Sequence, residues 1–159
     1  MSQRLRHSGI RLLASNRKVY HNYNILEKYE AGIELRGSEV KSIKNGNVNL
    51  AGGYVKIENG EAILYDVNVA KYQQGAHFSH DPLRPRRLLL HKSQIRKLAS
   101  YLEKKGFSII PLSIYLKNGL IKVEISACKG KKLVDRREEL RKKSMDREIE
   151  REMRKKIHL

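Results

Sequence analysis

The sequence has one cysteine and no long apolar run. Cys128 alone cannot form an internal disulfide or a cysteine-based zinc site, which excludes a disulfide-rich scaffold and fits a reducing compartment. No apolar stretch approaches the roughly 18 residues that a membrane span needs, and the basic N-terminus lacks an apolar segment followed by small residues. We therefore expect a cytoplasmic protein without a membrane partner.

Acidic residues are also scarce. The 159 residues include 17 Asp and Glu against 34 Lys and Arg, which leaves a formal charge of +17. The length suits one domain, and a hydrophobic content of 40% is enough to build its core. Because a field this positive attracts polyanions, nucleic acid is the first partner that the composition indicates.

The positive charge is distributed unevenly. Residues 1–18 carry +5 without any acidic residue, residues 19–128 carry +6, and residues 129–159 carry a further +6 in 31 positions. Dense basic ends of this kind often stay mobile until they meet a polyanion. The sequence therefore predicts a basic N-terminal arm over 1–18, a folded RNA-binding domain over 19–128 and a basic tail over 129–159.

Two Asn-Gly pairs predict β-hairpins, because a type I′ turn needs positive φ at both central residues. Asn59-Gly60 joins strand-like runs at 54–58 and 61–70, and Asn118-Gly119 joins runs at 107–117 and 120–129. Alternation predicts one shared face in the first hairpin for Ile63, Tyr65, Val67 and Val69, and one common core in the second for Ile110, Leu112, Ile114, Leu116, Ile121, Val123 and Ile125.

Outside the two hairpins, the sequence of the folded domain predicts further strands and two helices. Residues 19–35 are rich in Tyr, Val and Ile and predict one or two strands, with a bulge or tight bend at Ala31-Gly32. Helices are expected over 38–44 and from Ser93 to Leu102. This pattern predicts a mainly β protein, an OB-fold-like antiparallel β-barrel with two or three accessory helices and a basic C-terminal tail; an α+β sandwich is the alternative.

The tail has helix-stabilising charges but little apolar surface. Asp135 and Glu138 resemble a capping box, and four acid-first pairs follow at i, i+4 spacing. The apolar stripe is only one residue wide and consists of Met145, Ile149, Met153 and Ile157. One interpretation is a solvated charged helix or a frayed tail; the other is a conditional helix that forms in a negatively charged groove.

Evidence for an enzyme is weak. His77, His80, Asp81 and His91 include zinc-ligand types, but their spacing is nonspecific and the loop is punctuated by Gly and Pro. The sequence shows no phosphate-binding glycine loop and no nucleophile–base motif. We therefore expect no catalytic residue, no metal and no cofactor, and we expect Cys128 to be a small packed side chain.

Three clusters favour nucleic acid, although each could be an ordinary solvated face. The first, Asn16-Arg17-Lys18, precedes the rings of Tyr20, His21 and Tyr23, which can stack on unpaired bases. The other two are Arg84, Arg86 and Arg87, and Lys129, Lys131 and Lys132.

Four blocks of the sequence resemble a known family. NRKVYHNY (16–23), YEAGIELRGSEVKSIKNGNVNL (29–50), HDPLRPRRLLLHK (80–92) and KGKKLVDRRE (129–138) are similar to signature blocks of the small protein B (SmpB) family. The resemblance implies an OB-like barrel that binds the tRNA-like domain of transfer-messenger RNA. It also implies a noncatalytic, monomeric adaptor that delivers this RNA to stalled 70S ribosomes and replaces the anticodon arm.

The resemblance also implies site residues. In the body these are Asn16, Glu30, Leu89 and Lys122, with neighbouring residues Arg17, Lys18, Tyr20, Lys41, Lys44, Arg84, Arg86 and Arg87. His21 would face the decoding centre, and the tail residues Lys129, Lys131, Lys132, Asp135, Arg136 and Arg137 would enter the empty mRNA channel. Without the family, Leu89 suits core packing and Lys122 a solvent-facing strand position. Glu30 suits ordering of a basic side chain or acceptance of an RNA hydrogen bond. Val19, Pro85 and Cys128 depart from the usual family pattern.

Two other functions remain as alternatives. The first is a general ribosomal or single-strand RNA-binding protein of similar fold. The second is a nuclease that uses the His77/His80 loop. Binding to structured tRNA-like RNA with weak affinity for single strands would favour the adaptor, and metal-dependent RNA cleavage would favour the nuclease.

Overall fold

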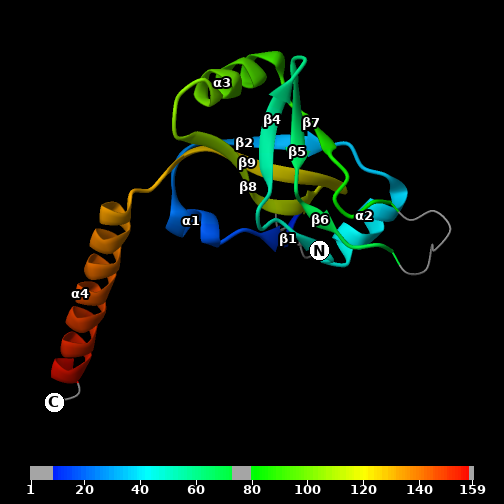
Figure 1. Ribbon diagram of the computed structural model, residues 1–159. Coiled ribbons are helices and arrows are strands. Elements are labelled where there is room, and N and C mark those ends of the chain that lie inside the picture. Colours follow the sequence, from blue (N-terminus) through cyan, green and yellow to red (C-terminus); the bar gives the residue numbers. More distant parts are fainter. Residues whose placement is uncertain (1–8, 73–79, 158–159) are drawn as a thin grey trace, which may run out of the picture.

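The computed structural model describes residues 9–72 and 80–157, which form a large antiparallel sheet with helices around it (Figure 1). In chain order the elements are β1 (Ile10–Ser15), α1 (Lys18–Asn22), β2 (Tyr23–Ile33), α2 (Gly37–Lys44), β3 (Val48–Asn49), β4 (Tyr54–Glu58), β5 (Glu61–Tyr65), β6 (Asn68–Val69), β7 (Arg86–Leu89), α3 (Lys92–Leu102), β8 (Phe107–Lys117), β9 (Leu120–Gly130) and α4 (Leu133–Ile157). Seven strands pair in the order β1-β8-β9-β2-β7-β5-β4, and β3 pairs separately with β6. The predicted mainly β, antiparallel architecture with accessory helices is confirmed.

Both Asn-Gly pairs form the predicted hairpins. Asn59 and Gly60 have φ values of 50° and 74°, and Asn118 and Gly119 have 50° and 81°. These left-handed conformations are the ones that a type I′ turn requires. Local turn chemistry therefore determines β4–β5 and β8–β9.

The core face expected for β5 is wrong in part. The two-residue turn sets Ala62 and Leu64 on the core side, whereas Ile63 and Tyr65 lie on the other face. Asp66 then adopts a left-handed φ of 57°, which interrupts the alternation. Val67 and Val69, two of the four residues expected on the shared face, consequently return to the core.

The apolar residues of the second hairpin do not share one core as predicted. They are divided between two hydrophobic clusters, because β8 contains a bulge. The pairing with β9 shifts between Pro111 and Ser113. An inserted residue reverses which face the following side chains occupy. Ile114 therefore packs in the main core, together with Ile109 before the bulge. Ile110 and Leu112 instead belong to a second, smaller hydrophobic cluster, which consists of Val19, Ile110, Leu112 and Cys128.

The first residues of the predicted strand at 19–35 are helical instead. They form α1, and Val19, which is only 4% exposed, anchors this helix in the second cluster. The remainder forms β2, as expected. The strand propensity of Val19 and Tyr20 is thus overridden by packing of one short turn against β8 and β9.

The bulge of β2 lies elsewhere than predicted. The register with β9 shifts between Ile25 and Glu27, not at Ala31-Gly32. Gly32 pairs in register with Lys122 on one side and Leu89 on the other. A Cβ at Gly32 would lie 3.1 Å from the Leu89 Cβ, so glycine permits close approach of β7 rather than a bend.

The predicted helices of the body are both present. α2 begins one residue before the expected start, and the Arg36 N–H donates to Glu39 Oε1 at 3.0 Å across its first turn. α3 begins at Lys92 rather than after Ser93, because the His91 N–H donates to Gln94 Oε1 at 3.1 Å. Gly46 and Gly106 follow these helices with positive φ values of 77° and 86°.

The sheet curves so that β4, at one edge, packs against β8, which lies next to the other edge. Gly53 is in this contact: a Cβ there would lie 2.7 Å from Val67 Cγ2 and 3.0 Å from Pro111 Cγ. The main core lies within the curved sheet and receives Ile43 of α2 and Leu98 of α3. α4 instead extends away from the sheet (Figure 1), and none of its 25 residues is buried.

Candidate nucleic-acid interface

One groove brings together three of the four body residues that the family resemblance implies. Glu30 on β2, Leu89 on β7 and Lys122 on β9 line the same cavity of about 670 Å³. They meet because β2 lies between β9 and β7, and Gly32 is paired with both Lys122 and Leu89. Arg87 and the start of α3 complete this sheet groove.

Glu30 is ionised and orders a neighbouring lysine. The Tyr115 hydroxyl donates to its carboxylate, and Lys117 Nζ lies 3.2 Å from both carboxylate oxygens. The hydrogen bond from Tyr115, followed by the contact with Lys117, lowers the pKa of Glu30. Burial and the negative charge of Glu30 raise the pKa of Tyr115, which therefore stays a hydrogen-bond donor.

The rest of the sheet groove combines apolar and cationic side chains. Leu89 is 50% exposed, so it does not pack in the core. Arg87 lies two residues before Leu89 on the same face of β7, and its guanidinium contacts Glu61 at 3.4 Å and Glu34 at 4.0 Å. Both contacts are solvent-exposed, so they hold the arginine only weakly and leave it available to a stronger anion.

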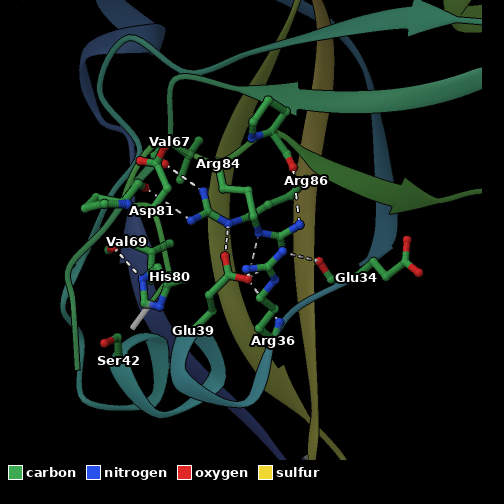
Figure 2. A network of polar contacts seen from close by, with 12 residues as sticks. Glu34, Arg36, Glu39, Ser42, Val67, Val69, His80, Asp81, Arg84 and Arg86 are labelled. Atoms are coloured by element: carbon green, nitrogen blue, oxygen red, sulfur yellow. Dashed lines mark hydrogen bonds and ion pairs between the residues drawn. The ribbon is translucent and has the colours of Figure 1, made fainter. Parts of the chain in front are cut away.

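Arg86 must be removed from the predicted phosphate-binding set. It is 1% exposed, and its guanidinium donates to the Glu39 carboxylate, to Val67 O at 2.8 Å and to Pro82 O at 3.2 Å (Figure 2). Arg84 also binds Glu39. Arg86 is buried whereas Arg87 is exposed, because side chains alternate along β7. Arg86 and Leu88 face inward, and Arg87 and Leu89 face outward.

His80 is likewise structural. It is 1% exposed, and its Nε2 lies 2.8 Å from Val69 O (Figure 2). Its Nδ1 lies 2.9 Å from Ser38 Oγ, so both ring nitrogens have protein partners. His77 lies outside the described residues. Within 9–72 and 80–157, no three His, Cys, Asp or Glu residues are grouped where they could hold a metal.

Asn16, the fourth implied residue, lies at a different place. It is 8% exposed, and its amide donates to Leu50 O at 3.4 Å and Pro111 O at 3.3 Å. It lines a second cavity, of about 350 Å³, with Lys18 of α1 and Tyr54 of β4. The sequence interpretation did not single out Tyr54; its position at the start of a predicted hairpin strand was the available signal.

Comparison with known proteins identifies the family. Residues 13–155 match the SmpB protein family. The chain belongs to the SmpB family. It is 49% identical over 153 residues to the SsrA-binding protein of Caldicellulosiruptor saccharolyticus, covering 96% of this chain and 97% of that protein. It is 51% identical over 146 residues to that of Alkaliphilus oremlandii, covering 92% and 94%. A solved structure described as "tmRNA-SmpB: a journey to the center of the bacterial ribosome" aligns with a TM-score of 0.65 and 43% identity, over 76% of this chain and 85% of that one.

In this SmpB-family chain, the predicted decoding-centre residue lies beside the tail helix. His21 and Asn22 of α1 line a small cavity of about 100 Å³ with Arg136 and other residues of the first turns of α4. Lys131 Nζ donates to Tyr20 O at 3.0 Å and to Glu139 at 2.6 Å, which connects α1, the end of β9 and α4. His21 is therefore a neighbour in space of Arg136, one of the predicted tail residues.

The remaining predicted SmpB residues are spread over the surface. Arg17, Lys18 and Tyr20 are exposed around α1. Lys41 and Lys44 are exposed on α2, and Lys41 Nζ lies 5.3 Å from the Tyr72 ring centroid. In the tail, the exposed residues are Lys129, Lys132, Asp135 and Arg137. The structure thus separates the predicted residues among the sheet groove, the surroundings of α1, α2 and the start of α4.

Proposed function

We propose that this protein is a noncatalytic adaptor that binds the tRNA-like domain of transfer-messenger RNA and delivers it to stalled ribosomes. The sheet groove carries the proposal, because Glu30, Leu89 and Lys122 come from three strands and converge on one surface. Support comes from relatives at about 49% identity that are named SsrA-binding proteins, and from the similar solved structure of tmRNA with SmpB.

The chemistry of the sheet groove suits a folded RNA. Lys122 and Arg87 attract phosphates, and Leu89 offers an apolar contact to a sugar or a base face. Glu30 cannot contact phosphate favourably, but its carboxylate accepts hydrogen bonds and so suits a 2′-hydroxyl or an exocyclic amine. Because the groove places acceptors such as Glu30 and Glu61 among its cationic donors, it offers an RNA more than phosphate contacts.

The tail performs the second step of the proposed function. Its charge of +6 suits entry into the RNA-lined mRNA channel of a ribosome whose message has ended. α4 has no buried face, so it can exchange its present surroundings for RNA at little cost in packing. His21 lies next to the first turns of α4, which favours a shared location near the decoding centre.

The proposal extends to the type of barrel, the oligomeric state and the location of the protein. The contact of β4 with β8 supports an OB-like barrel, which in this function takes the place of the missing anticodon arm. No described helix is long and apolar enough to cross a membrane. We propose a monomeric protein that acts in the cytoplasm, where translation takes place.

Binding and rescue measured on the same variants test the proposal. We expect the full chain to bind transfer-messenger RNA more tightly than ordinary tRNA, with a salt slope that counts the phosphates neutralised. Truncation after Gly130 should leave this affinity largely intact while abolishing rescue of stalled ribosomes. Lys122→Gln should weaken binding and reduce the slope by about 0.7 to 0.9.

Two outcomes would contradict the proposal. Equal loss of binding and rescue on truncation would remove the division of labour between domain and tail. Tighter binding to an unstructured single strand than to the tRNA-like domain would favour the general single-strand RNA-binding alternative.

A further inference from the structure

A second cavity lies at the opposite end of the β4–β5 hairpin from the sheet groove. The hairpin turn, Asn59-Gly60, lines the groove, whereas Tyr54 at the start of β4 lines this second cavity of about 350 Å³. Its other walls are α1, the loop at 51–53 and the beginning of β8. We refer to it as the tyrosine cavity, because Tyr23 and Tyr54 are its aromatic residues.

The Tyr54 ring is held in a defined position. It stacks on the Tyr65 ring with centroids 5.6 Å apart and an interplanar angle of 16°. Lys56 Nζ lies 5.7 Å from the Tyr54 centroid and 5.5 Å from the Tyr65 centroid. Tyr65 is in turn fixed by hydrogen bonds of 2.9 Å from its hydroxyl to both Glu58 oxygens. An aromatic ring fixed in this way loses little conformational entropy when a planar ligand stacks on it.

The loop opposite α1 contributes two glycines and is fixed to the sheet. Gly52 has a φ of 81°, and Gly53 has no room for a Cβ, so glycine is needed at both positions. The Asn16 amide joins this loop to β8 through Leu50 O and Pro111 O. Asn16 is therefore a positioning residue here: both of its N–H groups are used within the protein.

Cations adjoin the tyrosine cavity. A shallow neighbouring cavity of about 330 Å³ shares Asn16, Lys18 and Ala51 with it and adds Arg17. Arg17 and Lys18 are both exposed. None of the described residues lining either cavity is acidic, so the combined site favours an anionic ligand.

We propose that the tyrosine cavity binds one unpaired nucleotide of the RNA, with its base inside against Tyr54 and its phosphate at Lys18 and Arg17. A fixed aromatic ring beside flexible cations is the arrangement by which proteins hold unstacked bases. This inference rests on the proposed function, since it supplies the same RNA with a second point of attachment. It adds Tyr54 to Tyr20, His21 and Tyr23, the rings near Arg17 and Lys18 that the sequence predicts to stack on unpaired bases.

The first test compares full-length variants in titrations with the tRNA-like domain at several salt concentrations. Tyr54→Leu removes the aromatic face and should weaken binding about 5- to 150-fold without changing the salt slope. Tyr54→Phe keeps the ring and should bind within about twofold of wild type. Lys18→Gln should reduce the slope by about 0.7 to 0.9. Lys105→Gln is the matched charge control, because this exposed lysine lines none of the cavities described above.

The second test identifies the occupant. A photoreactive phenylalanine at position 54 should cross-link to an unpaired nucleotide of the RNA, and the same group at position 105 should not. If Tyr54→Leu does not fold, the cross-link and the Lys18→Gln slope decide the matter.

The outcomes separate the two proposals. Failure of the wild-type protein to bind the tRNA-like domain would refute the proposed function. Wild-type binding together with a folded Tyr54→Leu variant of unchanged affinity would refute the nucleotide site alone. Cross-linking from position 54 only to base-paired nucleotides would also refute it.

Discussion

Replacing Glu39 by alanine removes the carboxylate that binds the buried Arg86 and the partly exposed Arg84. Glu39 and Arg86 are 0% and 1% exposed, and Arg84, whose side chain is 25% exposed, binds the same carboxylate (Figure 2). In Glu39→Ala the Arg86 guanidinium keeps only Val67 O and Pro82 O as partners. A buried charge would then lack a counter-charge.

The expected magnitude follows from this loss. Removing one partner of a buried ion pair costs about 3 to 5 kcal/mol, because the remaining charge stays desolvated. For a chain of this length, each kcal/mol lowers the melting temperature by about 2 to 4 °C. Glu39→Ala should therefore melt about 6 to 20 °C below wild type.

Thermal and urea unfolding measure the effect. Glu34→Ala is the matched control: Glu34 also faces an arginine, but its contact with Arg87 is exposed and 4.0 Å long, so we expect a cost below about 1 kcal/mol. The double variant Glu39→Ala/Arg86→Leu should recover part of the loss, because it removes the unpaired charge. A Glu39→Ala variant no less stable than Glu34→Ala would refute the reasoning.

The same pair gives the protein an acid-sensitive component of stability. Burial alone would raise the pKa of Glu39, but the Arg36 N–H and the guanidinium groups of Arg84 and Arg86 outweigh it and lower the pKa below its usual 4.5. A carboxyl with a lower pKa in the folded state stabilises the protein above its unfolded pKa. That contribution is lost as the pH falls through the folded pKa. The difference between wild type and Glu39→Ala should therefore shrink in acid.

Two further predictions concern the second cluster and the tail. Burial raises the pKa of Cys128 to about 11, so at pH 8 the folded protein should react with a thiol reagent far more slowly than the protein in urea; equal rates would contradict the burial. Residues 129–159 as a peptide should gain helix, seen by circular dichroism, when RNA is added, because the tail has charge pairs but no buried face; an unchanged spectrum would favour a solvated helix or frayed tail.

Turn chemistry and short periodic patterns predicted much of the fold. Both Asn-Gly hairpins, α2 and α3 depend on residues close together in sequence, and the structure contains all four. The errors occurred where one residue changes the alternation. The bulge in β8 and the left-handed Asp66 each reverse the inward face, and neither has a decisive local signal. α1 was missed because tertiary packing of Val19 outweighs strand propensity.

Charge and composition alone could not separate surface arginines from structural ones. Arg84, Arg86 and Arg87 lie within four positions, yet Arg86 is buried against Glu39 and Arg87 faces the sheet groove. The partner Glu39 is 47 residues away from Arg86 in sequence. Pairing over such a distance is decided by the path of the chain.

The sequence by itself determined the hairpins, the division of charge among arm, body and tail, and the family blocks, since these depend on local conformation or on residue identity alone. Only the tertiary structure decided which side chains share a surface. It joined Glu30, Leu89 and Lys122 in one groove and Tyr54 with Lys18 in another cavity. The physical reason is strand order: β2 lies between β9 and β7, and the curved sheet brings β4 against β8, so residues distant in sequence become neighbours.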